Sequence, residues 1–241
     1  MTFIPRFFLI SLALTAPCIV RAAHFCTGDS IAGDTRNEFQ AWGGYSAHSG
    51  GPISSTPNTE FGVSGFLYSR RCWFSSKFSL SYNIGFMPVA LVHAPALGIS
   101  TILTVSSPVI PTSGGVWTVG GTYTYGGVAN STIISPAHTV YGFAATPIGF
   151  TFDAWRSSRI YPFAQVDGGL IKSSEPVPDN VPGGTSGNFL VSLGGGVKIR
   201  AGKFLAFSFG YKLMHMSNAG RSSFNPGLDN NVFFAGISLL K

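Results

Sequence analysis

Apolar and polar residues alternate along much of this chain, which is the pattern of a β-strand whose two faces meet different surroundings. From 205 to 213 the odd positions carry Leu, Phe, Phe, Tyr and Leu, and the even positions carry Ala, Ser, Gly and Lys. From 77 to 86 the even positions are apolar or aromatic and the odd positions are small or polar. Both stretches predict a strand with one apolar face.

The same pattern predicts eight strands in all, separated by segments rich in Gly, Ser, Pro and Asn. The sequence of the segment between residues 88 and 138 alternates less clearly. It leaves open whether this insertion is a long loop with its own hairpin or an extra pair of strands. The predicted strands cover residues 37–47, 60–70, 73–86, 139–155, 160–172, 188–200, 205–217 and 230–240.

These features predict an all-β fold, an eight-stranded antiparallel transmembrane β-barrel formed by residues 37–241. The strand number is even, short turns alternate with long loops, and each strand has an apolar face and a small or polar face. Closure of the barrel would pair the backbone groups that a bilayer cannot hydrate. Asp167 lies on a polar strand face, and a lumen residue is a simpler interpretation than a functional carboxylate.

The composition fits a membrane barrel better than a soluble domain. Only 10% of the residues are charged, against about a quarter in soluble proteins, and the mean hydropathy is +0.29. Beyond the N-terminus, however, no run approaches the roughly 20 apolar residues that a spanning helix needs. Strands are therefore expected to cross the membrane.

Residues 1–22 have the features of a secretory signal peptide. Arg6 lies in a short basic start, an apolar core follows from 7 to 20, and the small residues around Ala22 form the expected cleavage site. Residues 23–36 are expected to form a polar lead-in before the barrel. Export and strand pattern together predict a location in the cell outer membrane.

The charge balance argues against a nucleic-acid partner and for an anionic lipid surface. Cleavage removes Arg6 and Arg21 from 15 basic residues, so 13 basic and 9 acidic residues remain, a net charge of +4. The basic residues are dispersed rather than gathered in a dense patch with aromatics. Near strand ends they could meet lipid phosphates.

Two cysteines, Cys26 and Cys72, remain after cleavage. An oxidising compartment would allow a disulfide between them, and the sequence leaves this pairing open. Neither cysteine has a CxxC or histidine partner at metal spacing, so no structural zinc and no other metal is expected.

The strongest candidate chemistry lies at the end of the seventh predicted strand. His215 and Ser217 continue its apolar parity, and residues two apart are roughly 6 to 7 Å apart, so a hydrogen bond between the two side chains is feasible. A serine hydroxyl needs such a base to become a nucleophile. If 218–228 form a hairpin loop, the next strand returns antiparallel and brings Asp229 beside His215 as the third member of a triad.

The residues that follow the pair could complete the site. Asn218 and the backbone amides around Gly220 are candidate oxyanion donors or site-shaping groups. No organic cofactor is implied by these residues.

The motif His-x-Ser-Asn-Ala-Gly, followed by Asn-Pro-Gly-Leu and an acid fourteen residues after the histidine, resembles the outer-membrane lipid A 3-O-deacylases, or acyloxyacyl hydrolases. The resemblance implies an eight-stranded barrel with a catalytic triad on its outer wall. It implies His215 as base, Ser217 as nucleophile and Asn218 as an oxyanion or site-shaping group. Asp229 stands where the family's best-studied members have Glu, a departure that shortens the reach to the base by one methylene.

The resemblance implies a serine esterase that removes a 3-O-linked acyl chain from lipid A of lipopolysaccharide. Outer-membrane lipids are its other expected partners. Two alternatives stay open. One is a non-catalytic structural or adhesion barrel that retains the motif as scaffold. The other is a phospholipase or acyltransferase that uses the same triad on glycerolipids. The sequence does not determine the oligomeric state, and a homodimer stays open.

Overall fold

The computed structural model describes residues 36–54, 58–94, 97–106, 122–135, 137–177, 184–223, 225 and 227–241. The expected signal peptide, Cys26 and all of the lead-in before Arg36 lie outside the described residues. Within the described residues there is no helix of the length and apolarity needed to cross a membrane.

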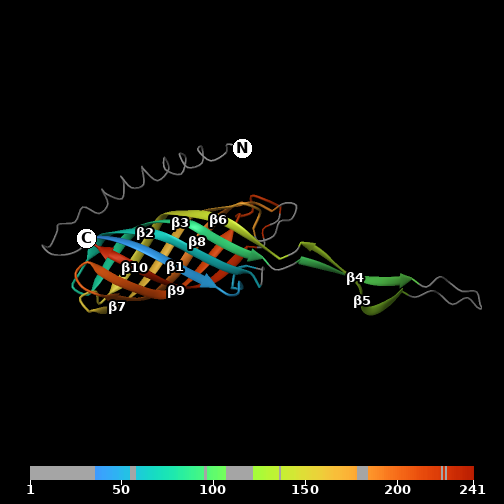
Figure 1. Ribbon diagram of the computed structural model, residues 1–241, viewed down its shortest axis with the longest axis horizontal. Coiled ribbons are helices and arrows are strands. Elements are labelled where there is room, and N and C mark those ends of the chain that lie inside the picture. The colour runs from blue at the N-terminus through green and yellow to red at the C-terminus, as the bar shows by residue number, and fades with distance from the viewer. Residues whose placement is uncertain are drawn as a thin grey trace, which may run out of the picture. The chain divides into compact units, whose positions relative to one another are not determined.

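Eight strands close into an antiparallel barrel (Figure 1). Around the barrel they follow the order β1-β10-β9-β8-β7-β6-β3-β2, and β2 pairs with β1 to complete the circle. This is the predicted architecture. The strands are β1 Asn37–Ser46, β2 Glu60–Phe74, β3 Phe78–Ala94, β6 His138–Ala154, β7 Ile160–Ser173, β8 Gly187–Arg200, β9 Leu205–Ser217 and β10 Leu228–Leu240.

The insertion contains two strands that pair with each other as a hairpin and are not part of the barrel's strand order. β4 Leu97–Ser106 and β5 Thr122–Ser135 pair antiparallel in a two-stranded sheet of their own. They belong to a compact unit that spans Pro95–His138. The barrel therefore closes without them, and β3 is followed around the barrel by β6.

The boundary between the second and third predicted strands was wrong. Trp73 pairs with Leu80 as part of β2, and the turn lies at 75–77. The reason is a bulge between Arg71 and Trp73, which interrupts the alternation of β2 and made the charged pair at 70–71 resemble a turn. Arg71 in fact points into the barrel and is 6% exposed. β3 also continues to Ala94, beyond the predicted end at 86.

The two faces of the barrel wall have opposite polarity. Outward side chains are apolar and exposed, for example Leu193, Phe209 and Phe233. Inward neighbours are polar and fully buried, for example Asn83 and Ser208. This reverses the arrangement of a soluble protein, and it is the alternation of an outer-membrane barrel whose outer wall faces lipid.

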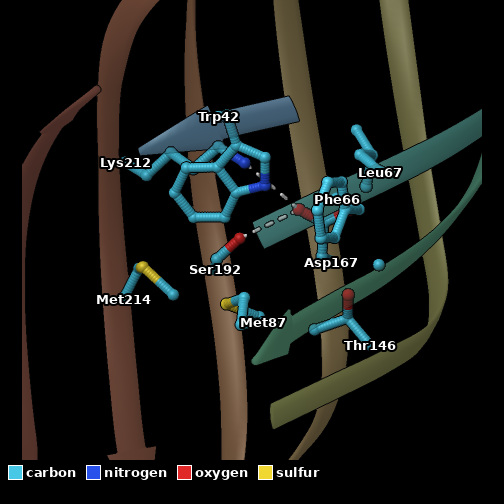
Figure 2. A pocket seen from close by; sticks show the side chains of 10 residues that line it. Trp42, Phe66, Leu67, Met87, Thr146, Asp167, Ser192, Lys212 and Met214 are labelled. Atoms are coloured by element: carbon cyan, nitrogen blue, oxygen red, sulfur yellow. Dashed lines mark hydrogen bonds and ion pairs between the residues drawn. The ribbon is translucent and has the colours of Figure 1, made fainter. Parts of the chain in front are cut away.

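Side chains fill the middle of the barrel, as expected for eight strands. Figure 2 shows Lys212 on the inner wall beside Trp42, with Asp167 and Ser192 joined by a hydrogen bond. Lys212 Nζ lies 3.8 Å from Asp167 Oδ2 and 4.4 Å from the centre of the Trp42 ring. The cavity that remains here is about 10 Å³. Asp167 is therefore a lumen residue that compensates a buried cation.

A second buried ion cluster crosses the barrel interior from β8. Lys198 Nζ lies 2.9 Å from Glu38 Oε2 and 3.4 Å from Asp153 Oδ1. Ser238 donates a hydrogen bond to the other oxygen of Glu38. These contacts join β8 to β1 and β6 across the lumen, and β10 to β1. They compensate the charges that are buried in the lumen.

The loops at the two ends of the barrel differ in length. At one end, which we call the short-turn end, the connections are 75–77, 155–159 and 201–204, and Asn37 pairs with the C-terminal Lys241. At the other end, the long-loop end, the connections include 47–59, 174–186 and 218–227. In outer-membrane barrels the short turns face the periplasm and the long loops face outward.

We expect Asp167→Leu to destabilise the barrel, because Lys212 would remain buried without its carboxylate. The expected loss is about 3–5 kcal/mol in the free energy of unfolding. Urea unfolding in detergent micelles, followed by tryptophan fluorescence, measures it. The double variant Asp167→Leu/Lys212→Met should recover much of the loss. Equal destabilisation in the single and double variants would show that the ion pair does not decide the stability here.

Candidate active site

His215 and Asp229 face each other across β9 and β10 at the long-loop end. Their Cα atoms are register partners, so both side chains leave the barrel on the same, outward face. His215 Nδ1 lies 2.5 Å from Asp229 Oδ1. The imidazole is 21% exposed, whereas the carboxylate is fully buried. A buried carboxylate thus contacts a partly exposed base.

The loop between β1 and β2 covers Asp229. The backbone amides of Ile53 and Ser54 each donate a hydrogen bond of 3.0 Å to Asp229 Oδ2. The Ser54 hydroxyl accepts the amide of Asp229, and the Gly50 amide donates to the Asp229 carbonyl. The two amides satisfy the carboxylate as an anion, and the other two contacts hold the loop against the backbone of Asp229. No pattern in the sequence pointed to this loop.

The contact with the Asp229 carboxylate selects the tautomer of the neutral His215 ring. An ionised carboxylate can only accept, so Nδ1 carries the proton and Nε2 keeps the lone pair of a base. Gly227 lies against the ring, because a Cβ at this position would be 3.2 Å from His215 Cε1. Its φ of 69° also favours glycine. The turn before β10 thus makes room for the imidazole.

Ser217 lies two residues beyond His215 on the same face of β9. Its Oγ accepts a hydrogen bond of 3.0 Å from the Ala219 amide. Among the described residues no hydrogen bond joins Ser217 to His215. Catalytic hydrogen bonds are often long or poorly aligned without substrate and tighten when it binds.

Asn218 and Gly220 build the turn that follows Ser217. Asn218 is buried, and its Oδ1 accepts the Gly220 amide at 2.9 Å. The Asn218 amide donates to Asn225 Oδ1 at 3.0 Å. Ala219 and Gly220 both have positive φ, which gives a tight left-handed turn. The backbone amides of Asn218, Ala219 and Gly220, in the region expected to supply oxyanion donors, are therefore all bonded within this segment.

Arg221, which the sequence analysis did not single out, lies beside this turn. Its Nε donates to the Asn218 carbonyl at 3.2 Å and its Nη2 donates to the Gly187 carbonyl at 3.0 Å. The guanidinium carbon is 4.6 Å from the centre of the Phe189 ring. Phe189 is the register partner of Ser217, so a cation lies next to the candidate nucleophile.

The described residues contain no group of three or more His, Cys, Asp or Glu side chains that could hold a metal ion. Cys72 is disulfide-bonded. The pairing with Cys26 stays a prediction, because Cys26 lies outside the described residues.

The chain matches one protein family model and several solved structures. The family model described as lipid A 3-O-deacylase (PagL) matches residues 103–238. The crystal structure of the outer membrane enzyme PagL matches with a TM-score of 0.48 and 16% identity, covering 83% of this chain and 97% of that chain. Neisserial surface protein A matches with a TM-score of 0.47 and 10% identity, over 84% and 96%. OprG from Pseudomonas aeruginosa matches with a TM-score of 0.42 and 8% identity, over 88% and 99%. A search of curated proteins finds no match.

We expect Gly51→Ala to weaken the contact between Asp229 and His215. A Cβ at position 51 would lie 2.7 Å from Asp229 Cβ, so either the loop or the carboxylate must move. The proton on His215 Nδ1, in so short a charge-assisted hydrogen bond, should give a strongly downfield NMR signal in the parent protein. That signal should disappear in Gly51→Ala.

Gly62→Ala is the matched control, because a Cβ there meets nothing closer than Tyr45 Cδ2 at 4.0 Å. It should keep the downfield signal. An unchanged signal in Gly51→Ala would show that the loop tolerates the methyl group and does not fix the carboxylate.

Proposed function

The chain belongs to the lipid A 3-O-deacylase family, and from that premise we propose that it hydrolyses the 3-O-linked acyl ester of lipid A with Ser217, His215 and Asp229 as a catalytic triad. As a member of this family it is an outer-membrane hydrolase that acts on lipid A. The observation that carries the triad is the 2.5 Å contact between His215 Nδ1 and the buried carboxylate of Asp229 on the outward face of the barrel.

The triad would act by acyl transfer in two steps. Ser217 Oγ attacks the ester carbonyl while its proton passes to His215 Nε2. The tetrahedral intermediate collapses, and the departing sugar oxygen takes that proton, which leaves the acyl chain on Ser217. His215 then takes a proton from water, the hydroxide attacks the acyl-enzyme, and Ser217 recovers its proton as the fatty acid leaves.

Asp229 would hold His215 in the tautomer that these steps need. Its negative charge stabilises the imidazolium that forms in each step. The amides of Ile53 and Ser54 already occupy its second oxygen, so the carboxylate needs no reorganisation during the reaction. Because the loop supplies this support, a short Asp can serve where the family has Glu.

Asn218 and Gly220 would shape the site beside the nucleophile. Their mutual hydrogen bond holds the left-handed turn close to Ser217. Release of either amide from its loop partner would provide an N–H for the oxyanion. We assign them a site-shaping role first, since both amides are bonded within the loop.

The location of the site suits a substrate that stays in the outer leaflet. The outward residues of β9 below His215 form an apolar strip of Leu213, Tyr211 and Phe209. An acyl chain that lies along such a wall remains in a lipid-like environment while its ester reaches the strand end. A non-catalytic barrel would not need a buried carboxylate beside this outward-facing histidine. A site in the lumen would not need one either.

We expect Ser217→Ala to abolish loss of an acyl chain from lipid A. Mass spectrometry of lipid A from cells that express the parent chain should show species that have lost one hydroxyacyl group, and Ser217→Ala cells should lack them. Ser223→Ala is the matched control, because Ser223 is an exposed residue of the same loop. Unmodified lipid A with folded parent protein would favour the non-catalytic barrel. Acyl loss or gain on glycerolipids instead would favour the phospholipase or acyltransferase.

We expect Asp229→Asn to lower kcat by about 10³–10⁴-fold, because an amide would present N–H to Nδ1 and leave Nε2 protonated. Hydrolysis of lipid A by purified protein in detergent micelles measures it. Glu60→Gln is the matched control, because it also replaces a carboxylate by an amide at the long-loop end. Glu60 accepts a hydrogen bond from the Tyr45 hydroxyl, and this variant should keep the parent rate. A parent-like kcat in Asp229→Asn would remove this carboxylate from the triad.

A further inference from the structure

Two cations lie beyond the row of Ser217 at the long-loop end, and the proposed hydrolysis leaves both without a role. Arg221 follows Ser217 in the loop after β9. Lys172 lies near the end of β7, is exposed, and shares the outward parity of Leu170. Gly187 connects them, because it is the register partner of Lys172 and its carbonyl accepts a hydrogen bond from Arg221.

The guanidinium of Arg221 is held in place although it is exposed. Two backbone carbonyls, of Asn218 and Gly187, and the Phe189 ring fix its plane. These contacts use two of the five N–H donors of the guanidinium, so three remain for an anion. A cation fixed in this way loses little conformational entropy when it binds.

The ammonium of Lys172 is held by one contact. Its Nζ donates to the Ser186 hydroxyl. An ammonium has three N–H donors, so two remain. Lys172 and Arg221 thus approach the same strand end, that of β8, from its two neighbours.

The cations lie farther from the apolar wall than Ser217 does. Ser217, Phe189 and Leu170 form one outward row across β9, β8 and β7. Phe189 is 42% and Leu170 is 52% exposed. Lys172 and Gly187 lie two residues further along their strands, roughly 6 to 7 Å by the rise per residue. An amphipathic ligand could place acyl chains on the row of Ser217, Phe189 and Leu170. Its anionic group could then lie at the upper row, the level of Lys172 and Gly187.

We propose that Arg221 and Lys172 form a binding site for a phosphate group of lipid A, which positions the substrate ester at Ser217. This inference rests on the proposed function. Lipid A carries its phosphates and its ester-linked acyl chains on the same small sugar unit, so the two rows match its polarity. The fork of a guanidinium matches phosphate oxygens, and a neighbouring ammonium adds a second charge. Arg221 is the principal contact and Lys172 the secondary one.

The test compares hydrolysis of phosphorylated and dephosphorylated lipid A by purified full-length protein in nonionic detergent micelles free of other phosphate. Arg221→Gln should lower kcat/KM on the phosphorylated substrate by about tenfold or more, mainly through KM, as for a lost charge-assisted hydrogen bond. It should leave kcat/KM on the dephosphorylated substrate close to the parent value. Arg221→Lys should retain part of the preference, and Lys172→Gln should lose less than Arg221→Gln.

Lys203→Gln removes the same charge at the short-turn end, where Lys203 is exposed, and should leave both substrates unaffected. An equal loss on both substrates in Arg221→Gln would overturn the proposal, because it would show that Arg221 supports the loop through Asn218 and Gly187. Equal hydrolysis of the two substrates by the parent protein would overturn it as well.

A binding measurement separates this proposal from the proposed function. Ser217→Ala protein should bind vesicles that contain phosphorylated lipid A more tightly than vesicles that contain the dephosphorylated form. Adding Arg221→Gln should remove that difference. Phosphate-dependent binding without hydrolysis by the parent protein would retain the phosphate site and reject the esterase. Hydrolysis without phosphate-dependent binding would do the reverse.

Discussion

The antiparallel register between β9 and β10 is the constraint on which the site depends. Residues 205–216 pair with 228–239, and this places His215 directly opposite Asp229. In a bilayer every backbone donor and acceptor of the wall must be paired, so the barrel has to close and its registers cannot drift. A slip by one residue would turn His215 into the lumen and bring the charged lumen residue Lys212 to the lipid face.

The barrel carries charge on both sides of its wall for different reasons. Inside, Lys212 with Asp167 and Lys198 with Glu38 compensate each other within a filled lumen. Outside, Asp229 lies on a face that otherwise meets lipid, and the loop between β1 and β2 must cover it. The same covering that makes this carboxylate tolerable also makes it a fixed partner for His215.

Most of the fold could be predicted from alternation, since each strand meets lipid on one side and a polar lumen on the other. The prediction was wrong where alternation breaks without a turn, as at the bulge after Arg71. It left the structure of the insertion open, because the sequence of β4 and β5 alternates less clearly; these strands form a separate two-stranded sheet. For the site, the sequence indicated a hairpin after Ser217 that would bring Asp229 beside His215. The catalytic roles of the three residues remain a proposal.

By itself the sequence determined the polarity of each strand face and the spacing of His215, Ser217 and Asp229, and hence which side chains could meet at the strand end. Only the tertiary structure decided what holds them. The amides that bind Asp229 are 175 and 176 residues away along the chain, and closure of β1 against β10 brings them there. Arg221 likewise acquires its position from Gly187 and Phe189 on β8. The alternation of apolar and polar residues predicts which face of the wall a side chain occupies. Contacts between distant segments depend on strand register and barrel closure, which a local sequence pattern does not determine.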